Sequence, residues 1–196
     1  MNTTGIEILS NPQPSAHIVY SYTDEAQLAD AVCLFASAGI RKVEAVLLVL
    51  SEAHYEPVRE RLTRQGFNLE DLESTGHLAC ENARSLLGTF MLDGIIDEHK
   101  FKTTIGGMIE TAKAGNTNGK KRQVRVFGEM VDLIWTRNPK ATARLEELWN
   151  EVISAHSVPL LCAYSLSGTR NTLSEQVLSC HSHAIRGERV EESAIH

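Results

Sequence analysis

The segment after the most apolar stretch of this chain lacks both glycine and lysine. Val46–Leu50 has the composition of a buried strand, and Ser51–Glu56 links it to a helical pattern. A phosphate-binding loop needs glycines, so that backbone N–H groups can surround the phosphates, and a lysine followed by serine or threonine. This link carries two glutamates instead, which would repel a triphosphate. The sequence therefore predicts a scaffold of the nucleotide-binding type that does not hydrolyse ATP.

Long apolar runs, an excess of positive charge and paired cysteines are also missing. No stretch approaches the roughly 18 apolar residues of a membrane span, and residues 1–14 lack the apolar core of a signal peptide. The net charge of -6 gives no support to binding nucleic acid or an anionic membrane. The four cysteines form no CxxC pair, which argues against structural zinc. As reduced, buried thiols they suit a cytoplasmic protein.

Length and composition indicate one folded domain with two tails. A chain of 196 residues that is 42% apolar can bury a full core. Residues 1–14 contain two prolines among mostly polar neighbours and are expected to form a flexible lead-in. Residues 15–185 form the predicted domain, and residues 186–196 form a charged tail.

Strand patterns alternate with helical patterns along the whole domain. The strands are expected near 17–22, 46–50, 77–81, 124–127 and 160–164. The helices are expected near 24–39, 55–65, 83–92, 97–113, 129–136, 139–153 and 170–183. This order predicts an α/β fold in three layers, a mostly parallel sheet of five or more strands with helices on both faces. The strand at 46–50 is the most apolar and is predicted to be central.

The carboxyl ends of the predicted strands select the candidate site. In open α/β sheets, ligands bind beyond these ends. The candidate ligand-binding residues are His17, Tyr20, His54, Glu129 and Tyr164. Because they belong to or follow different strands, we expect them to converge on one pocket. Regular alternation puts His17 and Tyr20 on opposite faces of their strand, so one of the two would serve the core.

Each of these polar residues also has a simpler structural interpretation. Glu129 is expected to anchor a ligand, but a carboxylate in the first turn of the 129–136 helix is also favoured by the helix dipole. His54 could contact a ligand or titrate near neutral pH, or lie in a surface loop. His17 could make a structural hydrogen bond instead of a ligand contact.

Motifs for metal binding and nucleophilic catalysis find little support. Cys180–His183 contains metal-ligating side chains, but on a helix these would point in different directions, so no metal site is predicted. No Gly-x-Ser-x-Gly nucleophile elbow occurs. We therefore expect neither catalytic residues nor a cofactor.

Several segments, in order, resemble a known family. They include His17–Tyr20, Phe90–Gly94, Arg125–Val131, Leu145–Asn150, Leu161–Tyr164 and Cys180–His183. In these the chain resembles the MEDS domain, the methanogen/methylotroph, DcmR-type sensory domain, over roughly residues 15–185. The resemblance implies a RecA/KaiC-like fold that has lost its phosphate-binding loop. It also implies a sensory role, for which small hydrocarbon-derived ligands have been proposed, and a part in transcription regulation.

These observations favour a non-enzymatic cytoplasmic signalling domain. A small organic molecule would bind at the carboxyl edge of the sheet and shift how the domain meets a separate signalling or regulatory protein. The tails are too short for a helix-turn-helix, so direct nucleic-acid binding is not expected, whereas a homo-oligomer remains compatible with the sequence. Two alternatives stay open: a nucleotide-binding or enzymatic domain with non-standard phosphate contacts, and a protein-interaction module with a vestigial pocket.

Overall fold

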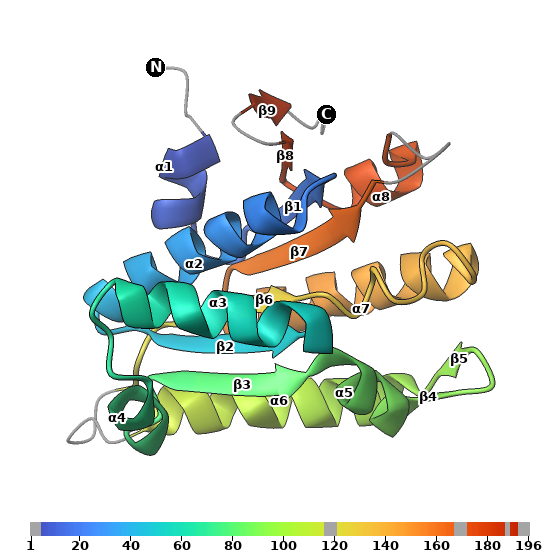
Figure 1. Cartoon of the computed structure of the whole chain (residues 1–196). Helices are drawn as coiled ribbons and strands as arrows, with labels where there is room; N and C mark the ends of the chain where they lie inside the picture. The colour runs from blue at the N-terminus through green and yellow to red at the C-terminus, as the bar shows by residue number, and fades with distance from the viewer. Residues whose placement is uncertain (1–4, 116–120, 167–171, 187–188, 192–196) are drawn as a thin grey trace.

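A seven-stranded sheet with helices on both faces forms the centre of the molecule (Figure 1). The computed structural model describes residues 5–115, 121–166, 172–186 and 189–191. The strands lie in the order β3-β2-β6-β7-β1-β8-β9, and all neighbours are parallel except the antiparallel pair β8 and β9. Their bounds are β1 His17–Tyr22, β2 Ala45–Leu50, β3 Leu78–Asn82, β6 Val124–Gly128, β7 Leu160–Ser165, β8 His183–Arg186 and β9 Arg189–Glu191.

Two layers of helices enclose the sheet and give it two separate apolar cores. One core lies against α1 Gly5–Ser10, α2 Glu25–Arg41, α3 Glu52–Arg64 and α4 Leu69–Ser74. The other lies against α5 Ala83–Phe90, α6 Glu98–Ala114, α7 Pro139–His156 and α8 Glu175–Ser179. A small hairpin, β4 Met91–Leu92 and β5 Ile95–Ile96, joins α5 to α6. None of the helices in the described part of the chain has the length and apolar character that a membrane crossing requires.

Alternation along β1 shows how the sheet divides its side chains. Val19 belongs to the core beneath α5–α8, whereas Ile18 and Tyr20 belong to the core beneath α1–α4. Every residue of β1 and of β2 is buried, as expected for strands that are covered on both faces. A side chain on one face therefore cannot meet a side chain on the other.

The fold confirms the α/β prediction and all five expected strands. The prediction that the strand at 46–50 is central is wrong, because β2 is the second strand from one edge of the sheet. A run of apolar residues indicates that a strand is covered on both faces. Every strand inside a covered sheet meets that condition, so the run does not show which strand is central. The predicted N-terminus of the 139–153 helix is confirmed, since Asn138 caps α7 by accepting from the Ala141 N–H at 3.0 Å.

Three predicted helices differ from the structure. The helix expected near 55–65 begins at Glu52, so Pro57 lies inside it. Proline has no N–H, so the carbonyl of Ala53 lacks its usual helical hydrogen bond. Because Ala53 is exposed, water can take the place of that bond. The segment expected as a helix at 129–136 forms consecutive turns.

The third difference concerns the helix expected at 170–183, of which residues 170–171 lie outside the described part of the chain. Only α8, Glu175–Ser179, is helical, and the chain then enters β8. The backbone and hydroxyl of Ser182 both donate to the carbonyl of His17, at 2.7 and 2.9 Å. These bonds draw the segment onto the edge of β1, so strand pairing replaces the last helical turns.

The two expected tails also contain structure. Helix α1 lies within the expected lead-in, and its Ile8 and Leu9 are buried in the core beneath α2. Residues 189–191 of the expected C-terminal tail pair with β8 as β9.

A buried arginine on β6 determines which residue can pack against it. Arg125 is 1% exposed, and its Nε donates to Glu44 at 2.6 Å while its Nη1 donates to the Phe35 carbonyl at 2.8 Å. A Cβ at Gly39 of α2 would lie 2.5 Å from Arg125 Nε. Since the guanidinium is held by these bonds, it cannot move aside, and only glycine fits at position 39.

Gly39→Ala should therefore destabilise the protein, although alanine normally favours a helix by about 1 kcal/mol. We expect the steric conflict with Arg125 to lower the free energy of unfolding by about 1–3 kcal/mol. The matched control is Gly107→Ala in α6, where a Cβ would meet nothing within 4 Å. That variant should be stabilised. Urea unfolding of both variants measures the difference, and a stabilised Gly39→Ala would contradict the packing argument.

Candidate functional site

A histidine held between two carboxylates lies at the carboxyl edge of the sheet. His54, in the first turn of α3, is buried, and its Nδ1 lies 2.8 Å from Glu129 Oε1. Its Nε2 contacts the carboxylate of Glu25 at the start of α2. Glu129, directly after β6, also accepts the backbone N–H of Ser51 at 2.9 Å. The carboxylate thus joins the end of β6 to the start of α3.

The carboxylates fix the charge of this histidine. Burial disfavours the charged ring, but Glu129 and Glu25 outweigh it and raise the pKa of His54 to about 9. With an acceptor on each ring nitrogen, the imidazolium form satisfies both contacts. His54 is therefore a cation at neutral pH, and Glu129 is its main buried counter-ion.

A second polar group lies beside this pair. Asp132 accepts the backbone N–H of Ser165 at 2.7 Å and its hydroxyl at 3.0 Å, beyond the end of β7. Tyr22, the last residue of β1, donates to Asp132 at 3.4 Å, and its ring lies edge-on to His54 with centroids 6.0 Å apart. Burial, followed by the neighbouring carboxylates, raises the pKa of Tyr22 well above its usual range. Strands β1, β2, β6 and β7 thus all contribute to one polar edge.

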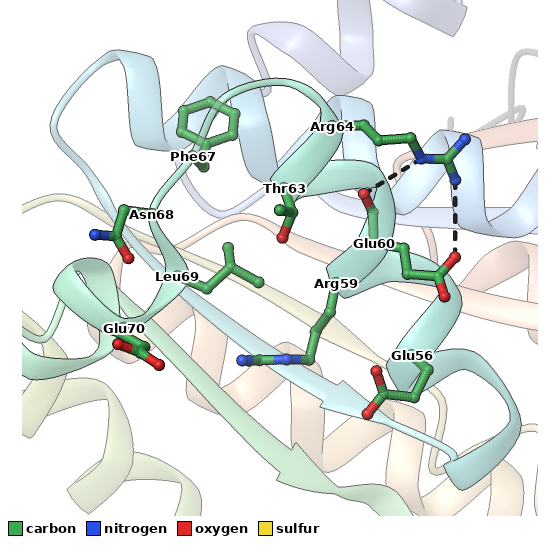
Figure 2. Close-up of a pocket in the computed structure, with 9 residues that line it drawn as sticks. All are labelled: Glu56, Arg59, Glu60, Thr63, Arg64, Phe67, Asn68, Leu69 and Glu70. Atoms are coloured by element: carbon green, nitrogen blue, oxygen red, sulfur yellow. Dashed lines mark hydrogen bonds and ion pairs between the residues drawn. The ribbon is translucent and has the colours of Figure 1, made fainter.

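The carboxyl edge also contains a cavity of about 600 Å³. Its lining residues come from the starts of α3 and α5 and from the turns after β6: Ser51, Glu52, Ala53, Asn82, Arg84, Ser85 and Leu133. A larger hollow of about 770 Å³ lies between α3 and α4 (Figure 2). That hollow is open to solvent along the outer side of α3 and contains alternating Arg and Glu side chains. Because ligands of open α/β sheets bind beyond the carboxyl ends of the strands, the smaller cavity is the candidate ligand site.

The five candidate residues do not converge on one pocket. The structure brings His54 and Glu129 together at the carboxyl edge. His17 and Tyr164 instead face α7, where both contact Glu146. Tyr20 lies on the opposite face, where its hydroxyl donates to the Gln27 carbonyl of α2 at 3.5 Å. The expected alternation of His17 and Tyr20 explains this separation.

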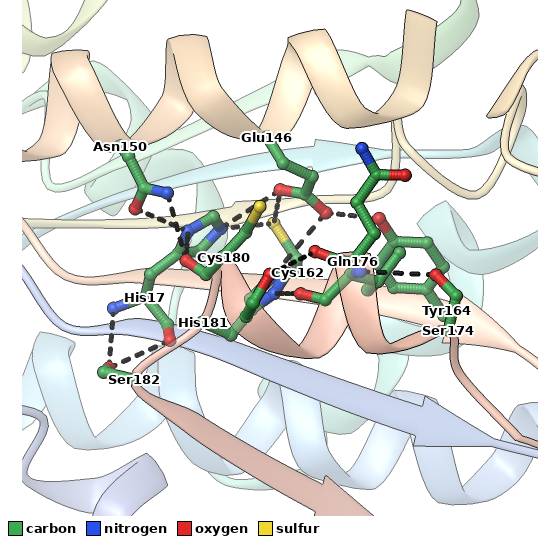
Figure 3. A network of polar contacts seen from close by, with 12 residues as sticks. His17, Glu146, Asn150, Cys162, Tyr164, Ser174, Gln176, Cys180, His181 and Ser182 are labelled. Atoms are coloured by element: carbon green, nitrogen blue, oxygen red, sulfur yellow. Dashed lines mark hydrogen bonds and ion pairs between the residues drawn. The ribbon is translucent and has the colours of Figure 1, made fainter. Parts of the chain in front are cut away.

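Around Glu146 the structure forms a buried cluster on the face of the sheet that α7 covers (Figure 3). Glu146 projects from α7 towards His17, Cys162, Tyr164 and His181. Burial disfavours its charge, but its neighbours, His17 and Tyr164 among them, outweigh this and hold the pKa of Glu146 at about 2. Burial lowers the pKa of His181 to about 4, so that ring is neutral at pH 7. The side chains of His17, Glu146, Cys162 and His181 could hold a metal ion.

Sequence reasoning missed Glu146 and Glu25. A signal for Glu146 exists, because Thr142, Glu146 and Trp149 follow one another at helical spacing on the buried face of α7. A glutamate within an apolar stripe requires a buried partner. Glu25 carries no such signal, since an acidic residue in the first turn of a helix is common.

The family model of the MEDS domain, the methanogen/methylotroph, DcmR sensory domain, matches residues 16–182 of the chain. The chain belongs to the MEDS family. Its resemblance to that family is thus confirmed, and the family is one of sensory domains. A search of curated proteins finds no match to this MEDS domain.

Among solved structures, the MEDS domain is similar to the crystal structure of the KaiC-like protein PH0186 from the hyperthermophilic archaeon Pyrococcus horikoshii OT3. The TM-score is 0.62 at 11% sequence identity, covering 88% of this chain and 71% of the other. This likeness confirms the RecA/KaiC-like fold.

His54 should make stability depend on pH. Its folded pKa of about 9 lies above the unfolded value of 6.5, so its contribution is complete below about pH 6.5 and is lost as the pH rises through about 9. Urea unfolding of the wild type and His54→Gln across this range should give a difference in free energy that shrinks as pH rises.

Thr63→Ala, an exposed position on α3 that does not titrate, is the control and should give a difference that does not change with pH. A pH-independent difference for His54→Gln would contradict the ion pairing with Glu129.

Proposed function

We propose that this MEDS domain is a non-enzymatic sensor that binds a small, oxygen-bearing organic molecule in the cavity of about 600 Å³ at the carboxyl edge. The bound molecule would change how the domain meets a separate signalling protein. The observation that carries this proposal is the position of the cavity, which is bounded by the ends of β2 and β3 and lies beside the His54–Glu129 pair. Membership of a sensory family supports it.

The cavity offers hydrogen-bond donors suited to oxygen atoms. Ser51 and Asn82 are the N-caps of α3 and α5, so the positive ends of two helix dipoles lie at its wall. Arg84 and Ser85 add side-chain donors, while Ala53 and Leu133 add apolar surface. Donors on one side and apolar groups on the other match a short alcohol, aldehyde or carboxylate.

A route from the cavity to the protein surface passes through one hydrogen-bonded chain. Ser51 lines the cavity, and its backbone N–H bonds to Glu129, which binds His54. His54 in turn contacts Glu25, an exposed residue of α2. A ligand that moved Ser51 would therefore alter the contacts of α2, which supports the proposal of a partner at this surface.

The alternative of nucleotide binding receives less support. Only Thr23 and Asp24 separate β1 from α2, and only Ser51 separates β2 from α3. Neither link contains glycine or is long enough to wrap a phosphate chain. The carboxylates of Glu25, Glu129 and Asp132 would also repel phosphates.

Filling the cavity should abolish binding. In a thermal-shift screen of short alcohols, aldehydes and carboxylates, we expect at least one to raise the melting temperature of the wild type. Ala53→Trp places an indole in the cavity and should remove that shift, because the indole occupies the space of the ligand. The variant should still fold, since Ala53 is exposed and packs against no core residue.

The matched control is Thr63→Trp, an exposed position on the same helix that lines the hollow between α3 and α4. Its shift should equal that of the wild type. If Thr63→Trp removes the shift and Ala53→Trp keeps it, the ligand binds between α3 and α4 and the proposed site is wrong.

Mg-ATP should be neither bound nor hydrolysed. The links after β1 and β2 lack the backbone donors that would surround its phosphates. Phosphate release by the purified chain should match the buffer background, and Mg-ATP should leave the melting temperature unchanged. Turnover that Ala53→Trp abolishes would favour the enzymatic alternative.

A further inference from the structure

We propose that His17, Glu146, Cys162 and His181 form a closed binding site for a divalent metal ion of the zinc class. The four residues come from β1, α7, β7 and the segment between α8 and β8. Their ligand atoms all lie within 4.8 Å of one another, and all four side chains are buried. The site lies on the α7 face of the sheet and is separate from the proposed ligand cavity.

Three of the distances between the ligand atoms match the edges of a tetrahedron. His17 Nε2 lies 3.3 Å from Glu146 Oε2 and 3.3 Å from Cys162 Sγ, which lies 3.8 Å from the same carboxylate oxygen. A tetrahedral edge is about 1.6 times the bond to its centre, so zinc bonds of about 2.0–2.3 Å correspond to edges of about 3.3–3.8 Å. The fourth ligand atom, His181 Nε2, lies within 4.8 Å of the other three and 3.5 Å from the second carboxylate oxygen of Glu146, Oε1.

Outer contacts orient both histidines as metal ligands. His17 Nδ1 lies 3.0 Å from Asn150 Oδ1 and 3.1 Å from the Cys180 carbonyl, so this nitrogen carries the proton. His181 Nδ1 lies 2.7 Å from the Val177 carbonyl and is protonated for the same reason. In the neutral rings both Nε2 atoms therefore present lone pairs to the centre. This is the second shell typical of metal-bound histidine.

His181 Nε2 gives a second, independent sign of a cation-binding site. It is fully buried and has no hydrogen-bond partner. Its lone pair faces a carboxylate, an arrangement that is repulsive without a cation between them. A metal ion would turn this repulsion into two favourable bonds.

The charges of the four residues match a divalent ion. The carboxylate of Glu146 and a thiolate at Cys162 carry two negative charges, and the two neutral imidazoles carry none. A divalent cation makes the buried site neutral, which is the state that a water-free interior favours. When the metal binds, the Cys162 S–H bond breaks, the sulfur bonds to the metal and the proton leaves to solvent.

Ligand number and type favour zinc and a structural role. Nitrogen and sulfur donors in a tetrahedral set are typical of Zn²⁺, and four protein ligands leave no open position for a substrate. The ion would tie the segment after α8 to β1, α7 and β7. It would thereby hold β8 against the edge of β1, where Ile18 pairs with His183.

A metal-free arrangement is the competing explanation. A proton on His17 Nε2 would make a buried ion pair with Glu146, whose other oxygen accepts the Tyr164 hydroxyl. That arrangement satisfies His17 and Glu146, but it leaves His181 Nε2 without a donor.

Cobalt titration of the full chain, prepared without a histidine tag and stripped with a chelator, separates the two. We expect one Co²⁺ per chain, with the intense visible bands of tetrahedral cobalt and a thiolate-to-cobalt charge-transfer band, both displaced by Zn²⁺. Cys162→Ser should remove the charge-transfer band. Cys80→Ser, a half-buried thiol on β3 outside the cluster, should keep it.

A second variant covers the case in which Cys162→Ser does not fold. Asn150→Ala removes an outer contact of His17 and should weaken Zn²⁺ affinity by about tenfold or more while circular dichroism remains native. Folded wild-type protein that binds no Co²⁺ or Zn²⁺ would overturn the proposal in favour of the imidazolium–carboxylate pair. A thiolate-to-cobalt charge-transfer band that persists in a folded Cys162→Ser variant would overturn it as well.

Discussion

Alternation along the strands of a sheet that is buried on both faces governs where this protein can build polar sites. Successive side chains of β1 enter different cores, so His17 and Val19 lie towards α7 while Ile18 and Tyr20 lie towards α2. Among the described residues inside the sheet, each apolar side chain belongs to one core or the other. Polar side chains from different strands can therefore contact one another on the same face of the sheet. They can also meet beyond the strand ends, where side chains no longer alternate between the two faces.

The molecule uses both options, and each is centred on a buried carboxylate. At the strand ends, Glu129 holds the backbone of Ser51 and the ring of His54. On the α7 face, Glu146 receives contacts from both neighbouring strands β1 and β7. A buried carboxylate costs several kcal/mol unless it is paired, so each fixes its partners in place. The first pairing involves the exposed Glu25 and can respond to solvent, whereas the second is sealed.

The sequence predicts the fold better than it predicts the site, for physical reasons. Strands β1, β2, β6 and β7 are buried and mostly apolar, which a local pattern reveals, whereas β8 forms because Ser182 bonds to the distant His17. The sequence places His54 and Glu129 together at the carboxyl edge because both lie just beyond the ends of strands. His17 and Tyr164 were assigned to the wrong pocket, since the strand-end rule ignores which face a residue occupies. Glu146 could have been predicted by asking which polar residues of α7 fall on the same helical face as its apolar residues.

The segment around α8 is the element that could connect the two polar sites. Strands β1 and β7 are paired in parallel and run from the Glu146 cluster to Tyr22 and Ser165 at the carboxyl edge. The segment around α8 lies against both the cluster and the end of β1. It contributes His181 to the cluster, while Leu178 and Ala184 line a hollow of about 160 Å³ next to Ser21 near the end of β1. The contacts of His181 with Val177 and Glu146 therefore set how firmly α8 is held against the cluster.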